Sequence, residues 1–279
     1  MEILTVVEVN CSSAAPLLYL NTTTDDIAAA KCVGFNIDIF IGPSQTGAVS
    51  LDGLKNIGDK THDGGLHVVN CSQVTSISGD SIQISGGWLT AENSPLLTTF
   101  SFPLLSWIGL GLSLTDVPLL DQLELANGVV VGELDVPETI GSSTIDNTGL
   151  SKIDGLFGGT TRDISITNNP RLQTVHLLAS QIVLQHNASY TGNLVITENS
   201  ANITIDLPNL FSIAGSMSLG SVAELSIPSL GLVNGSMELI GASFPSLSAP
   251  QLQRINGNLS ITGSFSRYTR PQISFINIS

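Results

Sequence analysis

One phrase occurs three times in the last third of the sequence. Residues 208–219, 228–239 and 250–261 all follow the pattern Pro-x-Leu-x-x-(Ile/Val)-x-Gly-x-(Met/Leu)-x-(Leu/Ile), and their prolines lie 20 and 22 residues apart. Weaker copies precede them, for example from Pro103 and from Pro170. Repeats of this length are typical of solenoids, in which each repeat forms one coil and packs only against neighbouring coils.

Each part of the phrase has a physical interpretation. The final alternation of residues has a period of two, which predicts a short half-buried strand in every coil. The leading proline suits a corner, where it has no amide hydrogen bond to lose. The glycine suits a tight bend or a positive φ, so Gly215, Gly235 and Gly257 should occupy equivalent corners. The last apolar residues should stack in one buried column, formed by Leu219, Leu239 and Ile261.

These features predict a mostly β fold: a single right-handed β-solenoid with irregular leucine-rich repeats of about 20–22 residues. An isolated coil cannot cover its own apolar side chains or pair its own strand, so the phrase has to recur. We assign residues 36–279 to this solenoid. Residues 1–35 are interpreted as an N-terminal segment that ends in a capping helix.

The ends of a solenoid expose unpaired strand edges and need caps. At residues 23–34 the sequence TTDDIAAAKCVG predicts a short capping helix, with Thr23 as its N-cap, acidic residues in the first turn and Gly34 just beyond its end. The far end, residues 266–279, has neither a cysteine nor a helical pattern. We therefore expect the C-terminal cap to be missing from this chain.

Two cysteines, Cys11 and Cys32, bracket the only helix-like segment ahead of the first long strand. A disulfide between them would stabilise the cap by roughly 3 kcal/mol. We predict that they are bonded or within bonding reach, and a Cα separation beyond about 7 Å would contradict this. The third cysteine, Cys71, is expected to be a buried thiol.

Asparagine stands two residues after the last apolar position of a predicted strand at four places. In leucine-rich repeats, buried asparagines at such positions bond the backbone of adjacent coils. We predict a structural ladder of this kind, with four ordinary turn asparagines as the alternative. The members are Asn70, Asn127, Asn147 and Asn168.

Composition excludes some partners. Only 11% of the residues are charged, and the formal net charge is -14. This charge repels nucleic acids and anionic lipid headgroups. The start of the chain has no basic segment and is not predicted to be a signal peptide, and the longest apolar run, residues 102–114, is too short to span a bilayer.

Sequons for N-glycosylation are more frequent than we expect from the composition, which favours a secreted protein; composition alone is the alternative. Asn70 also lies in a sequon, but a place in the ladder would make it a poor acceptor. The glycosylation candidates are Asn187, Asn202, Asn234, Asn258 and Asn277.

No pattern of catalytic or metal-binding residues emerges from the sequence. A hydrolase triad needs a histidine near an acid and a nucleophile, whereas the histidines here lie in turn-like or strand-flanking segments. These are His62, His67, His176 and His186. The spacing in HDGGLH matches no usual metal site, and no glycine-rich phosphate loop is present. We predict no catalytic, cofactor-binding or metal-binding residue. Trp88 and Trp107 are interpreted as packing residues, with sugar stacking as the alternative.

Longer stretches resemble a known family. These are DDIAAAKCVGFNIDI near the start, PLLSWIGLGLSLTDVPLLDQLEL, IDNTGL and ITNNPRLQTV in the middle, and the repeated phrase. In this order they resemble the fungal GPI-anchored cell-wall-organisation and sporulation-specific proteins, a family with receptor L-domain-like repeats. The resemblance covers about residues 25–265. It implies a secreted wall or membrane glycoprotein with a lipid anchor, an L-domain-like solenoid and no known active site.

The chain departs from that family pattern at both ends. The signal peptide, the C-terminal cysteine-containing region, the Ser/Thr-rich stalk and the anchor signal are expected to be missing. Three functions remain open: a non-enzymatic wall-organising surface protein, which we favour, a receptor-like module that binds a glycan or a protein, and a polysaccharide-cleaving β-helix enzyme. We expect a monomer whose partners are wall polysaccharides or wall proteins, with no nucleic acid.

Overall fold

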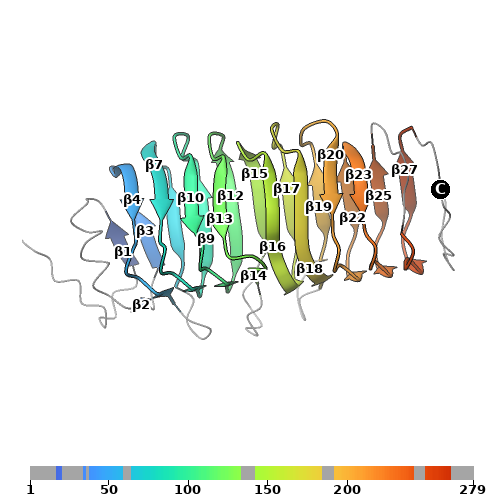
Figure 1. Cartoon of the computed structure of the whole chain (residues 1–279), viewed down its shortest axis with the longest axis horizontal. Coiled ribbons are helices and arrows are strands. Elements are labelled where there is room, and N and C mark those ends of the chain that lie inside the picture. The colour runs from blue at the N-terminus through green and yellow to red at the C-terminus, as the bar shows by residue number, and fades with distance from the viewer. Residues whose placement is uncertain are drawn as a thin grey trace, which may run out of the picture.

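The computed structural model describes residues 17–20, 34–35, 38–58, 64–132, 142–183, 192–241 and 249–264. Every regular element in these ranges is a β-strand, and no helix long and apolar enough to cross a membrane is found among them. The strands of successive coils lie side by side and form an elongated rod (Figure 1). The predicted β-solenoid is confirmed.

One long wall of the rod is an eleven-stranded sheet, to which each coil contributes one strand, and all its strands are parallel. Its strands, in spatial order, are β1 (Leu17–Leu20), β3 (Asp38–Ile41), β6 (Leu66–Val69), β9 (Trp88–Glu92), β12 (Gly111–Val117), β15 (Ser143–Thr148), β17 (Ile164–Thr167), β19 (Leu194–Thr197), β22 (Met217–Gly220), β25 (Met237–Ile240) and β27 (Leu259–Thr262).

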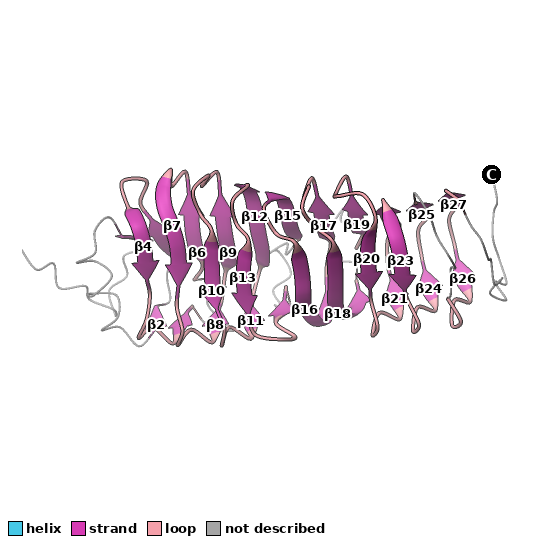
Figure 2. Ribbon diagram, turned by 45° about the horizontal axis from the view of Figure 1, so that its top comes forward, coloured by secondary structure: helices cyan, strands magenta, loops and turns pink. Residues whose placement is uncertain are grey.

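Two shorter sheets close the N-terminal coils. The four-stranded sheet contains β4 (Thr46–Ser50), β7 (Gln73–Ser78), β10 (Thr99–Phe102) and β13 (Gln122–Leu125). The five-stranded sheet contains β2 (Gly34–Phe35), β5 (Asn56–Ile57), β8 (Ile84–Ser85), β11 (Trp107–Ile108) and β14 (Val130–Val131). Figure 2 shows these walls on the side of the rod turned away from the long sheet.

In the C-terminal half these two walls merge into a seven-stranded sheet. The long strand β18 pairs with one strand near its start and with another near its end, so a single strand spans the corner. The members are β16 (Lys152–Thr161), β18 (Thr174–Ile182), β20 (Ile203–Asp206), β21 (Ser212–Ile213), β23 (Val222–Ser226), β24 (Leu232–Val233) and β26 (Arg254–Ile255).

The core is one continuous apolar cluster inside the coils. In the long sheet every second residue points inward, and side chains at equivalent positions, such as those of Ile145, Ile166 and Ile196, stack with no exposed surface. Cys71 is a free, buried thiol in this cluster, as predicted. Its burial raises the pKa of the thiol, so the protonated Sγ can donate to the carbonyl of Ile41 at 3.3 Å.

The repeat alignment is also confirmed. Leu219 pairs with Leu239, and Leu239 pairs with Ile261, in neighbouring strands. The first two side chains are fully buried, and Ile261 is partly buried against the core. Bonded partners on neighbouring coils lie 20 residues apart at Ser218 and Glu238 but 31 apart at Asp116 and Asn147. The short period therefore describes the last coils and some earlier ones, such as the coil between Ile145 and Ile166, while other coils are longer.

Some predictions concern residues outside those described. The capping helix at 23–34 lies there except for Gly34, which begins strand β2, and the Cys11–Cys32 disulfide lies there as well; both stay predictions. Trp107, in contrast, is only 6% exposed and packs with Leu110 in a small apolar cluster, which Trp88 and two other side chains flank. Packing is thus the structural role of Trp107.

The repeated position is a glycine for a different reason from the tight bend or positive φ that the sequence suggested. Among the described residues, Gly215, Gly235 and Gly257 are not at positive φ; they lie where neighbouring coils approach closely. The amide of Gly235 donates to the carbonyl of Gly215 at 2.7 Å, and the amide of Gly257 donates to the carbonyl of Gly235 at 2.9 Å. A Cβ at Gly235 would lie 2.7 Å from the carbonyl carbon and oxygen of Gly215, too close for any side chain.

This close approach generates a stability prediction. Gly235→Ala should lower the free energy of unfolding by about 1–3 kcal/mol, because the new methyl group meets backbone that cannot yield cheaply. Gly231→Ala is the matched control, since its Cβ would lie 3.5 Å or more from the nearest atoms, and its effect should stay within about 0.5 kcal/mol. Urea unfolding followed by circular dichroism measures both. Equal destabilisation by the two variants would contradict the close packing of these coils.

Candidate functional site

The outer face of the long sheet presents a regular array of small polar side chains. Because inward residues alternate with outward ones, each strand from β12 to β22 places one or two side chains on this face. We call the following set the hydroxyl face: Ser113, Thr115, Thr144, Asp146, Ser165, Thr167, Val195, Thr197 and Ser218. All nine are partly exposed, and seven of them carry a hydroxyl group.

The strand register lines these side chains up in two columns. Thr144 pairs with Ser113 on one side and with Ser165 on the other. In the second column Thr167 pairs with Asp146 and with Thr197. Each column thus runs along the axis of the rod, with one side chain for each coil.

The charged member of the face is held by its neighbours. The Asp146 carboxylate accepts from the Thr167 hydroxyl at 2.6 Å and from the Asn168 amide at 2.8 Å, both through Oδ1. These bonds come from the next coil along the axis. The carboxylate is therefore part of a polar ladder and offers the face a fixed acceptor.

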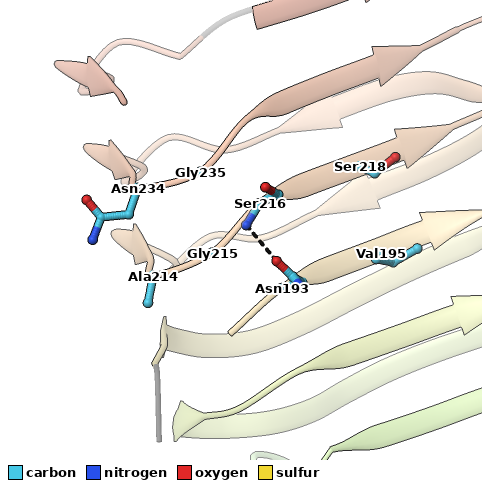
Figure 3. A pocket seen from close by; sticks show the side chains of 8 residues that line it. All are labelled: Asn193, Val195, Ala214, Gly215, Ser216, Ser218, Asn234 and Gly235. Carbon is cyan, nitrogen blue, oxygen red and sulfur yellow. Dashed lines mark hydrogen bonds between the residues drawn. The ribbon is translucent and has the colours of Figure 1, made fainter. Parts of the chain in front are cut away.

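A hollow of about 480 Å³ lies beside this face, where β19 and β22 begin (Figure 3). Its lining is small and uncharged: Asn193, Val195, Ala214, Gly215, Ser216, Ser218, Asn234 and Gly235. The glycines and the alanine leave the space open. At its edge, the Asn193 Oδ1 accepts from the Ser216 backbone amide of the neighbouring coil at 2.7 Å. This volume is within the range of about 300–1,000 Å³ that is common for small-ligand sites.

The predicted asparagine ladder differs from the structure. Asn70, Asn147 and Asn168 follow strands of the long sheet and have φ values of 58°, 49° and 55°. Asn70 and Asn168 are exposed, Asn147 is partly exposed, and their bonds across coils join side chains: Asn70 Oδ1, for example, accepts from Asn93 Nδ2 at 2.6 Å. Asn127 is exposed after β13, in another sheet. A buried ladder of these four residues is therefore wrong.

The inward position is one residue later. A residue in the left-handed region turns the chain, so the next side chain points into the coil. The buried Asn169 accepts from the Thr148 hydroxyl at 2.7 Å, donates to the carbonyl of Ile145 at 3.0 Å and contacts Asn199 Oδ1 at 3.0 Å. The Asn-Asn pair at 168–169 could have indicated an inward asparagine. Adjacent residues at a corner point in opposite directions, so one of the two side chains points into the coil.

The histidines also differ from the prediction. His67 and His176 lie within strands β6 and β18, on outward positions, while His62 and His186 lie outside the described residues. His176 Nδ1 is 2.9 Å from Asp154 Oδ1, and its Nε2 is 3.7 Å from Asp206 Oδ2. Both ring nitrogens thus face carboxylates of neighbouring coils, an arrangement suited to holding coils together rather than to activating a nucleophile.

The candidate glycosylation sites lie on the surface where they are described. Asn202, Asn234 and Asn258 are all exposed, and Asn70, which shares the sequon pattern, is exposed as well. Asn187 and Asn277 lie outside the described residues. In the described part of the chain, no group of three or more His, Cys, Asp or Glu side chains could hold a metal ion.

Fold and surface together define a parallel β-solenoid protein with one hydroxyl-rich sheet face. Protein ecm33 of Aspergillus fumigatus is 26% identical over 243 residues, which make up 87% of this chain and 56% of that protein. A cell surface GPI-anchored protein of Arthroderma benhamiae is 28% identical over 188 residues, or 62% of this chain and 46% of that protein. The chain is therefore related to these two fungal proteins, one of which is named as a cell surface GPI-anchored protein.

The chain spans about half the length of these curated relatives. No protein-family model matches it, and no solved structure does. The similarity to receptor L domains therefore stays a prediction.

The corner at Asn169 supplies the prediction for this part of the structure. Asn169→Ala should lower the free energy of unfolding by at least about 2 kcal/mol, because the buried Thr148 amide and hydroxyl lose their acceptor. Asn168→Gly is the control: it keeps the positive φ, removes one exposed bond and should cost less than about 1 kcal/mol. Chemical denaturation measures both. If the two variants lost the same stability, the inward corner position would not matter.

Proposed function

We propose that this chain belongs to a non-enzymatic glycoprotein of the fungal cell surface and wall, which contributes to wall organisation and integrity. The observation that carries the proposal is the similarity to the cell surface GPI-anchored protein and to ecm33, which together match both halves of the rod. We place the protein outside the cell, at the surface or in the wall; the name of the Arthroderma benhamiae relative gives a cell-surface location for that protein.

The surface chemistry supports a structural role. An elongated rod with a hydroxyl-rich face that carries few charges offers many weak hydrogen bonds along its length, and a wall protein that cross-connects polymers needs such a surface. Glycans at Asn202 and Asn258, both exposed, fit the same location, whereas Asn234 lines the hollow and has to stay unmodified for a ligand to enter it. The proposal extends to Asn187 and Asn277, and to a disulfide between Cys11 and Cys32.

The enzyme alternative finds less support. A polysaccharide-cleaving β-helix would bring three or more carboxylates together on one face, and the contacts around His176 join two, Asp154 and Asp206. A receptor-like module remains a second candidate because of the hollow beside the hydroxyl face, which has the size of a ligand site.

Deletion of the gene in its source organism tests the proposal. The deletion strain should become hypersensitive to wall-perturbing dyes, because a wall that lacks one of its cross-connecting proteins is weaker. A version with a signal peptide and an anchor should restore resistance, and a version without an anchor should not. Dye sensitivity on plates and wall sugar composition are the measurements. Normal resistance with normal composition, or release of sugars from wall glucan, chitin or mannan by the purified protein, would refute the proposal.

A further inference from the structure

We propose that the hydroxyl face binds an extended, neutral, β-1,4-linked polysaccharide with acetamido groups, the chemistry of chitin, and that the polymer lies along the axis of the rod. This inference rests on the proposed wall function, because it names the wall polymer that the protein contacts. Three properties of the described surface carry it: its repeat, its charge and the hollow.

The first property is the repeat along the axis. Parallel strands lie about 4.8 Å apart, so each column of the hydroxyl face presents one side chain per strand at that interval. This interval is close to the length of one sugar unit in an extended β-1,4-linked chain. Ser113, Thr144 and Ser165 are in register on neighbouring strands, and each hydroxyl can both donate and accept. A polymer along the axis would therefore have a hydroxyl group within reach at most of its units.

The second property is the charge of the face. Asp146 is the charged residue of this set, and its carboxylate is already held by Thr167 and Asn168. A net charge of -14 on the whole chain disfavours an acidic polymer. A protein partner would call for the aromatic and apolar centre that protein interfaces have, and the hydroxyl face contains a single apolar residue, Val195. A neutral, polyhydroxylated ligand fits this surface best.

The third property is the hollow beside the face. Val195, Ala214 and Gly215 give it small apolar walls, and Asn193 and Asn234 add amide groups. An acetamido group likewise combines a methyl with an amide, so it matches both kinds of wall. Val195 and Ser218 belong to the hollow and to the hydroxyl face alike (Figure 3). A chain on the face therefore passes the hollow, which favours an N-acetylated polymer over an unsubstituted one.

In binding of this kind, the free energies of the individual contacts add up along the polymer. Each hydroxyl contact adds little by itself, but contacts on successive coils act on one ligand and raise its effective concentration for the next. Affinity should therefore rise steeply with the length of soluble chitin oligosaccharides, up to the length of the face.

Binding to insoluble chitin, cellulose and β-1,3-glucan tests the inference, with the full chain produced through a secretory host. The wild-type protein should prefer chitin. The double variant Thr144→Val, Thr197→Val removes one hydroxyl from each column and keeps the β-branched shape, so we expect its apparent Kd for chitin to rise at least about tenfold. Thr174→Val, Thr204→Val is the matched control, because these residues pair with each other on the seven-stranded sheet, and its Kd should not change.

A further variant probes the hollow. Ala214→Leu fills it, so the preference for chitin over cellulose should fall while binding to cellulose stays the same. Circular dichroism and thermal unfolding confirm that every variant is folded. Absence of chitin binding by the wild-type protein, a stronger affinity for β-1,3-glucan, or equal losses in the two threonine pairs would each overturn the inference. A dye-hypersensitive deletion strain whose protein does not bind chitin would leave the proposed function intact and refute only this ligand.

Discussion

The parallel hydrogen-bond register between coils is the constraint on which the rest of the structure depends. It brings equivalent residues of successive coils next to each other, so a property of one position becomes a column along the rod. Inside, it stacks Ile145, Ile166 and Ile196 into a core without exposed surface. Outside, it aligns the serines and threonines of the hydroxyl face. The same strand alternation thus produces both the buried columns and the surface columns, because alternate residues of a strand point to opposite sides.

Two kinds of hydrogen bond at the corners hold this register in place. At the repeated glycines, the backbones of neighbouring coils bond directly, with no room for a side chain. After the strands of the long sheet, a residue in the left-handed region turns the chain, and the next side chain bonds the neighbouring coil from within, as Asn169 does. Both kinds act between coils rather than inside one, which is why a single coil has no stability of its own.

The small number of charged residues suits a role in surface contacts, since only 11% of the residues are charged. The described residues form few ion pairs, and several of these lie across coils, such as the contacts of His176 with Asp154 and Asp206. Three acids of the long sheet, Asp116, Asp146 and Glu238, accept from hydroxyls or amides of neighbouring coils. A sheet face that is rich in hydroxyl groups and carries few charges suits contact with other polyhydroxylated polymers, and the relative named as a cell surface protein agrees with such surroundings.

The sequence by itself determined the solenoid, because period and alternation are local properties: the phrase at 208–261 predicted the column of Leu219, Leu239 and Ile261 and the strand in each coil. It also supported the family, through the order of its motifs. Only the tertiary structure decided which asparagine points inward, why Gly235 must be a glycine, and that His176 lies between two acids. These facts depend on the backbone angle at each corner and on the offset between coils of unequal length, and both are settled when coils pack against one another.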